Sequence, residues 1–97
     1  MKKKLMLETR CCAGYGYYVY AENGMPDEVV EKLKKFSMWG GSTKTYQNHK
    51  AYELTEERMH VMQTVEFREF LEEHNVELIT DKDDTYDACR ELIANIK

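Results

Sequence analysis

The sequence predicts an α+β fold in one compact domain, residues 1–97, with a mixed, largely antiparallel sheet of four to five strands and three or four helices mainly on one face. Apolar and polar residues alternate with period 2 in several short stretches, which is typical of strands. Other stretches repeat apolar residues every three or four positions, as amphipathic helices do. With 97 residues, 42% of them hydrophobic, the chain is long enough to bury one core, and it contains no repeat.

Two strands joined by a tight turn are expected at the start of the chain. The alternation covers residues 5–11 and then residues 15–21, and the short link between them contains Gly14. Glycine takes the positive φ that such a loop often needs. We therefore expect a β-hairpin over this segment.

A helix is expected after the turn at Asn23-Gly24. Pro26 suits the first helical position, acidic residues follow it, and a pair of lysines occupies the last turn, so that the charges complement the helix dipole. The glycine pair at 40–41 ends the helix. The residues expected on its buried face are Val29, Val30, Leu33 and Phe36.

Further strands and helices are expected in the middle of the chain. Residues 43–46 and 51–54 are strand-like, with a turn at 47–50, and the helical pattern begins at Thr55, a good N-cap. The apolar stripe breaks near Gln63-Thr64, which predicts a bend or two helices meeting there, the second running to about His74. Asn75 is expected to stop it in a left-handed conformation, before a strand over 76–80.

The end of the sequence predicts a last helix and no metal site. Asp83 or Asp84 can cap that helix, whose core-facing residues are Ala88, Cys89, Leu92, Ile93 and Ile96. Four aspartates lie within residues 81–87, but they lack the glycine and the distal glutamate of an EF-hand loop. We expect neither a metal nor another cofactor.

Charge separates the two halves of the chain. Residues 1–50 carry nine Lys/Arg and five Asp/Glu, whereas residues 51–97 carry five and thirteen. An acidic chain without a Lys/Arg stripe is a poor binder of phosphate backbones, so direct nucleic-acid binding is not expected. No apolar run reaches the length of a membrane span, and three cysteines do not form a disulfide framework, so we expect a cytoplasmic protein with reduced thiols.

Catalytic motifs are missing from the sequence. Cys11 or Cys12 could in principle pair with a histidine as a thiolate dyad, but no nucleophile signature, C-x-x-C or H-E-x-x-H occurs. We therefore expect a protein that is not an enzyme and keep a Cys-dependent enzyme as the third hypothesis.

Tyrosines gather in the predicted hairpin. Tyrosine is favoured at protein interfaces because it buries a large amphipathic ring with few rotors. It is also a strong strand former, and cross-strand aromatic packing would explain the same residues. The candidate partner-binding residues are Tyr15, Tyr17, Tyr18 and Tyr20.

A second candidate site follows the first helix. Glycine amides, a hydroxyl and a tryptophan ring could bind an anion and stack on a base, although the spacing of a phosphate loop is missing. Helix termination with a core tryptophan is the simpler interpretation. The alternative ligand-binding residues are Trp39, Gly40, Gly41 and Ser42.

The leading hypothesis is a small, non-catalytic binding protein that contacts a larger, basic protein, such as a phage or mobile-element inhibitor of a host defence protein. A homodimer is an additional expectation, because helices on one face of a sheet leave the other face to a partner or to a second copy. The runner-up is an oligomer that binds or sequesters a nucleotide or another small ligand.

Overall fold

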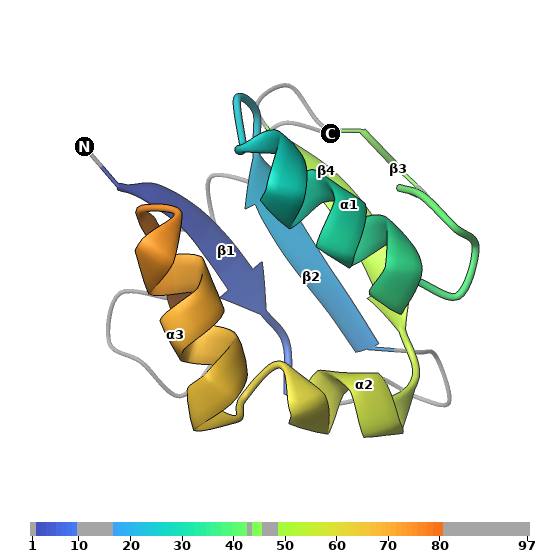
Figure 1. Ribbon diagram of the computed structural model, residues 1–97. Helices are drawn as coiled ribbons and strands as arrows, with labels where there is room; N and C mark the ends of the chain where they lie inside the picture. The colour runs from blue at the N-terminus through green and yellow to red at the C-terminus, as the bar shows by residue number, and fades with distance from the viewer. Residues whose placement is uncertain (1, 10–16, 43, 46–48, 81–97) are drawn as a thin grey trace.

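The computed structural model describes residues 2–9, 17–42, 44–45 and 49–80, and it has the α+β architecture expected from the sequence (Figure 1). Its strands lie in the spatial order β3-β4-β2-β1-β5. The elements in chain order are β1 (Lys3–Leu7), β2 (Tyr17–Glu22), α1 (Asp27–Phe36), β3 (Lys44–Thr45), β4 (His49–Leu54), α2 (Glu56–Val61), α3 (Val65–Glu73) and β5 (Val76–Thr80).

The sheet is mixed and largely antiparallel. β2 pairs antiparallel with both β1 and β4, and β4 pairs antiparallel with β3. β5 is the exception, because it pairs parallel with β1. The chain leaves β4, passes through α2 and α3, and returns to the free side of β1 as β5. β2 is therefore the central strand of the sheet, and its expected antiparallel pairing with β1 is confirmed.

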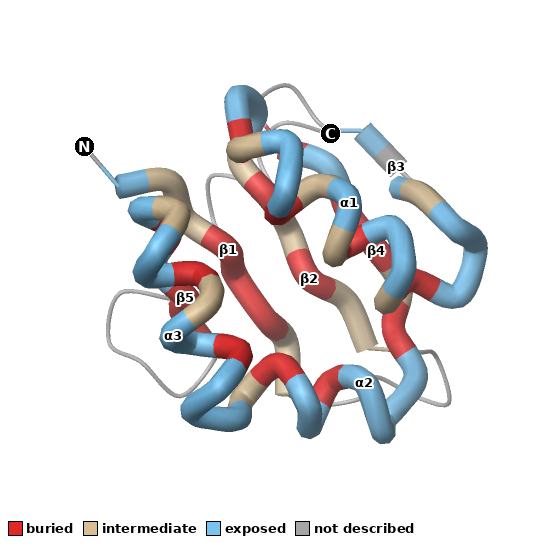
Figure 2. Tube along the Cα trace, viewed as in Figure 1, coloured by how far each residue is buried: buried red, intermediate tan, exposed pale blue. Residues whose placement is uncertain are grey.

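Helices α1 and α3 lie side by side across one face of the sheet, and α2 lies at one end of the strands (Figure 1). Side chains from this inner face of the sheet and from all three helices form the hydrophobic core, and the buried segments in Figure 2 follow this layer. The fully buried members of the core are Leu5, Leu7, Val19, Val29, Leu33, Leu54 and Met62.

The three described helices begin at, or within one residue of, the positions that their local sequence predicts. α1 begins at Asp27, one residue later than expected, because Pro26 is its N-cap and not its first helical residue. On the expected buried face, Val29 and Leu33 are buried, whereas Val30 and Phe36 are partly buried against the core. The break in the apolar stripe is confirmed as two helices, because the Thr64 hydroxyl accepts a hydrogen bond from the Phe67 amide (3.3 Å) and so begins α3. The left-handed Asn75, with φ of 59°, is also confirmed.

Three sequence-based expectations are wrong. α1 ends at Phe36, with Ser37 as its C-cap, and not at the glycine pair 40–41. β4 begins at His49, inside the expected turn over 47–50. The strand extends to this residue because His49 pairs with Glu22 of β2. The tryptophan after α1 was expected to be a core residue, but Trp39 is 67% exposed. The tight turn near Gly14 and the C-terminal helix with its aspartates lie outside the described residues.

Candidate functional site

Alternation along β2 divides the candidate tyrosines between the two faces of the sheet. Tyr17 points to the inner face and packs, partly buried, against the core. Tyr18 and Tyr20, two residues apart, both point the other way and lie half-buried on the outer face, opposite the helices. Tyr15 lies outside the described residues. The structure thus brings together only two of the four tyrosines on one surface.

Tyr18 and Tyr20 form an ordered pair of rings. Their centroids are 6.4 Å apart with an interplanar angle of 21°, a stacked arrangement. The Tyr20 hydroxyl donates a hydrogen bond to Glu8 Oε1 (2.5 Å), and the Glu8 amide donates one to the Tyr18 carbonyl (2.9 Å). The two strands of the hairpin therefore fix both the rings and the carboxylate beside them.

Trp39 joins this surface from the far side of β4. The indole Nε1 donates a hydrogen bond to Glu53 Oε1 (2.9 Å), and the Met38 amide donates one to the Glu53 carbonyl (2.8 Å). Glu53 in turn lies opposite Tyr18 in the β2–β4 register. The segment after α1 is thereby attached along β4, although Trp39 itself stays exposed.

Members of both candidate sets, Tyr18 and Tyr20 from one and Trp39 from the other, thus lie on one surface. We call it the aromatic–acidic patch, and it consists of Glu8, Tyr18, Tyr20, Trp39 and Glu53. It combines three aromatic residues with two carboxylates, and its members come from β2, β4, the residue after β1 and the segment after α1. No sequence signal indicated Glu8 or Glu53, because strand register alone brings these residues to the tyrosines.

The other residues of the alternative ligand site form an exposed turn. Gly40 has φ of 72°, a conformation that glycine adopts without strain, and Ser42 is exposed. A Cβ built on Gly40 or on Gly41 would have no atom within 4 Å. These glycines therefore line no close-fitting cradle, and ligand binding by Trp39, Gly40, Gly41 and Ser42 stays a prediction.

Beyond the patch, the outer face is apolar at its centre and polar at its other end. Met6 and Ile79, neighbours across β1 and β5, are buried here, and Ala51 lies opposite Tyr20. His49, opposite Glu22, is only 8% exposed, and its Nδ1 has no hydrogen-bond partner among the described residues. Burial lowers the pKa of His49, while the Glu22 carboxylate acts in the opposite direction.

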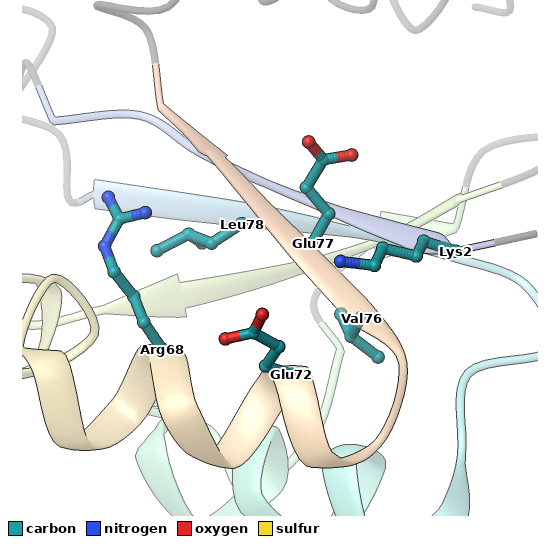
Figure 3. Close-up of a pocket in the computed structure, with 6 residues that line it drawn as sticks. All are labelled: Lys2, Arg68, Glu72, Val76, Glu77 and Leu78. Carbon is teal, nitrogen blue, oxygen red and sulfur yellow. The ribbon is translucent and has the colours of Figure 1, made fainter.

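A charged pocket of about 280 Å³ lies where β5 meets α3. Figure 3 shows Arg68 and Glu72 extending from α3 towards β5, while Glu77 projects from the opposite side of that strand. Lys2, Val76 and Leu78 complete the lining. Because charges of both signs share this pocket, it has no clear preference for an anion or a cation.

The described residues include no group of three or more His, Cys, Asp or Glu side chains arranged to hold a metal ion. Within the same ranges, every helix falls short of the length and apolar character that crossing a membrane requires. The cysteines considered for a thiolate dyad, Cys11 and Cys12, lie outside the described residues. Comparison with known proteins adds no relative: no family model, no curated protein and no solved structure matches the chain.

Proposed function

We propose that this chain is a non-catalytic binding protein and that its aromatic–acidic patch contacts a protein partner with basic side chains. The exposed Trp39 carries the proposal. Tryptophan, tyrosine and arginine dominate the binding energy of protein interfaces, and a tryptophan that a monomer exposes and also holds in place by a hydrogen bond is a suitable anchor.

Preorganisation of the patch supports this function. The rings of Tyr18 and Tyr20 stack on each other, and Glu8 and Glu53 hold the Tyr20 hydroxyl and the Trp39 indole. Side chains that are already ordered lose less entropy when a partner binds. A partner would therefore meet a surface whose aromatic groups need little rearrangement.

The charge of the patch supports a basic partner. Glu8 and Glu53 each have one carboxylate oxygen in a hydrogen bond, and the patch as defined contains no Lys or Arg. The whole chain carries a net charge of −4, so long-range attraction also favours a positively charged partner. Arginine fits best, since its guanidinium both pairs with carboxylates and stacks on aromatic rings.

Site-specific photocrosslinking tests the proposal directly. A photoreactive phenylalanine analogue replaces Trp39 in one variant and Val65, which is 66% exposed on α3, in a matched control. We expect crosslinks to one defined protein from position 39 and none to that protein from position 65. Equal labelling from both positions, or a Trp39→Ala variant that binds the captured protein with unchanged affinity, would contradict the proposal.

The identity of the captured protein tests the finer prediction. A host defence protein would support an inhibitor of phage or mobile-element origin, whereas a crosslink to another copy of this chain would make the patch a homodimer interface. In each case the affinity is measured again with Glu53→Gln, which keeps the shape of the side chain and removes its charge. We expect about a tenfold loss for a basic partner, equivalent to about 1.4 kcal/mol.

A further inference from the structure

The two edges of the sheet differ in how well they are protected against pairing with another chain. β3 forms one edge and is only two residues long, whereas β5 forms the other with five. Proteins blunt an exposed edge by shortening the strand or by placing proline, lysine or a bulge in it. β5, with the sequence VELIT, has neither proline nor lysine, and its register with β1 is continuous. Among the described strands it pairs with β1 alone, so its other side is open to a further strand.

Two residues of β5 direct their main-chain groups to this open side. The Lys3 amide donates a hydrogen bond to the Asn75 carbonyl (3.3 Å), and Lys3 is the register partner of Val76. In a parallel ladder a residue bonds to the two neighbours of its register partner, and successive residues point their N–H and C=O groups to alternate sides. Val76 and Leu78 therefore point both groups away from β1. Within the described ranges, these N–H and C=O groups have no hydrogen-bond partner.

The pocket of about 280 Å³ lies beside this open side, between β5 and α3. Val76 and Leu78 form the apolar part of its lining, and Arg68 and Glu72 extend from α3 towards β5 (Figure 3). Side chains of an added strand would alternate between this pocket and the outer face of the sheet. Main-chain hydrogen bonds to an edge strand, together with a pocket for a side chain, are the means by which sheet edges recognise extended peptides.

Glu77 indicates the charge of the strand that fits here. It is exposed on the outer face, between the two residues that direct their main-chain groups to the open side. Its register partner in β1 is Lys4, but no ion pair joins the two side chains. Because an opposite charge on a neighbouring strand stabilises the pair and a like charge destabilises it, Glu77 favours a lysine or arginine on the added strand.

A second copy of this chain fits the same edge less well. Pairing of β5 with its own copy about a two-fold axis would bring the acidic residues of two α3 helices together, in a chain whose net charge is −4. Arg68 and Lys2 offset only part of this charge. A basic partner avoids the repulsion. The exposed glutamates of α3 concerned are Glu69, Glu72 and Glu73.

We infer that the open side of β5 binds an extended, basic segment of another protein as an added strand, with main-chain hydrogen bonds to Val76 and Leu78 and a basic side chain beside Glu77. An apolar side chain of that segment would enter the pocket between β5 and α3, which has no clear preference for either charge. The site shares no residue with the aromatic–acidic patch, so it does not depend on the proposed function.

Amide hydrogen exchange of the free protein tests whether the edge is available. We expect the amides of Val76 and Leu78 to exchange much faster than those of Glu77 and Ile79, which are directed to β1. Equal protection of all these amides would show that the edge is already covered. Protection of Val76 and Leu78 that rises with protein concentration would assign the edge to a second copy. Either result would overturn the inference.

Titration of the ¹⁵N-labelled protein with a short capped peptide of alternating lysine and valine tests the occupant. We expect saturable shifts and slower exchange of the Val76 and Leu78 amides. A peptide with glutamate in place of lysine should bind more weakly, and one with methylated main-chain nitrogens should not bind, because it cannot donate to the carbonyls of β5. Linear shifts, equal affinity for the lysine and glutamate peptides, or shifts confined to the aromatic–acidic patch would each overturn the inference.

A matched pair of charge reversals locates the electrostatic contribution. Glu77→Lys should weaken binding of the lysine peptide about fivefold and strengthen binding of the glutamate peptide. Glu28→Lys makes the same change at an exposed position on α1 and should alter either affinity by less than about twofold, because exposed charges at a distance are screened. Equal losses in the two variants would show that net charge alone attracts the peptide, and the inference would fail.

Discussion

The two faces of the sheet use the same strands for different purposes. On the inner face, Leu7 and Val19 are fully buried against helices and belong to one continuous core. On the outer face, the residues next to them in the chain, Glu8 and Tyr18, are half-buried and joined by the Glu8 amide's hydrogen bond to the Tyr18 carbonyl. Neighbouring residues therefore differ in role because successive side chains of a strand point to opposite faces.

This difference teaches that residue type alone does not reveal a contact surface. Tyr17 and Tyr18 are adjacent and chemically identical, yet one completes the core and the other belongs to the aromatic–acidic patch. Trp39, the residue type most expected in a core at this position, is instead held on the surface by Glu53. Substitutions that contrast the two faces test whether this division of roles is real.

The largest effect is expected on the inner face. Leu7→Ala should lower the free energy of unfolding by about 2–5 kcal/mol, because it removes a fully buried side chain and leaves a cavity. Glu8→Ala, one residue further on, should cost about 1 kcal/mol or less, since it removes only a half-buried hydrogen bond. Urea denaturation followed by circular dichroism measures both values. Similar losses would mean that the two faces are equally packed.

A crossed effect is expected for the two adjacent tyrosines. Tyr17→Ala should cost about 2 kcal/mol of stability through lost core packing and leave partner affinity unchanged in the folded fraction. Tyr18→Ala should cost about 1 kcal/mol, mainly its stacking on Tyr20, and weaken partner binding about tenfold. Denaturation and partner titration of both variants check this. If Tyr17→Ala lost more affinity than Tyr18→Ala, the assignment of faces would be wrong.

A smaller effect is expected from the hydroxyl on the outer face. Tyr20→Phe should lower the free energy of unfolding by about 1 kcal/mol, because the hydrogen bond to the Glu8 carboxylate is charge-assisted but half-buried. A double-mutant cycle with Glu8→Gln isolates the pair. Additive losses in that cycle would show that the two side chains do not interact in solution.

The smallest effect concerns His49 and acidity. Burial lowers the pKa of His49 below 6.5, its value in an unfolded chain, so the unfolded state binds more protons as the pH falls below that value. The stability conferred by the neutral ring is therefore present above about pH 6.5 and is lost as the pH falls through the lower, folded pKa. The melting temperature should fall between about pH 7.5 and about pH 5.5, and this fall should be larger for the wild type than for His49→Gln. An equal fall in both proteins would show that His49 titrates as it does when unfolded.

Local sequence predicted much of the fold because the signals were themselves local. The helix dipole charges of α1, the capping hydroxyl of Thr55 and the left-handed Asn75 act within a few residues, and the structure confirms each of them. The start of β4 was missed because a strand's length depends on its partner. His49 belongs to the sheet through its pairing with Glu22, which lies far away in the sequence.

The candidate site was predicted only in part for the same reason. Sequence composition indicated Tyr18, Tyr20 and Trp39 as residues suited to binding, since aromatic residue types carry that information by themselves. Register and the path of the chain after α1 decided the rest: they packed Tyr17 against the core and brought Trp39 to Glu53. Alternation, capping and charge were thus determined by the sequence itself, whereas the tertiary structure decided which distant side chains meet, because those contacts depend on strand pairing and helix packing between segments far apart in the chain.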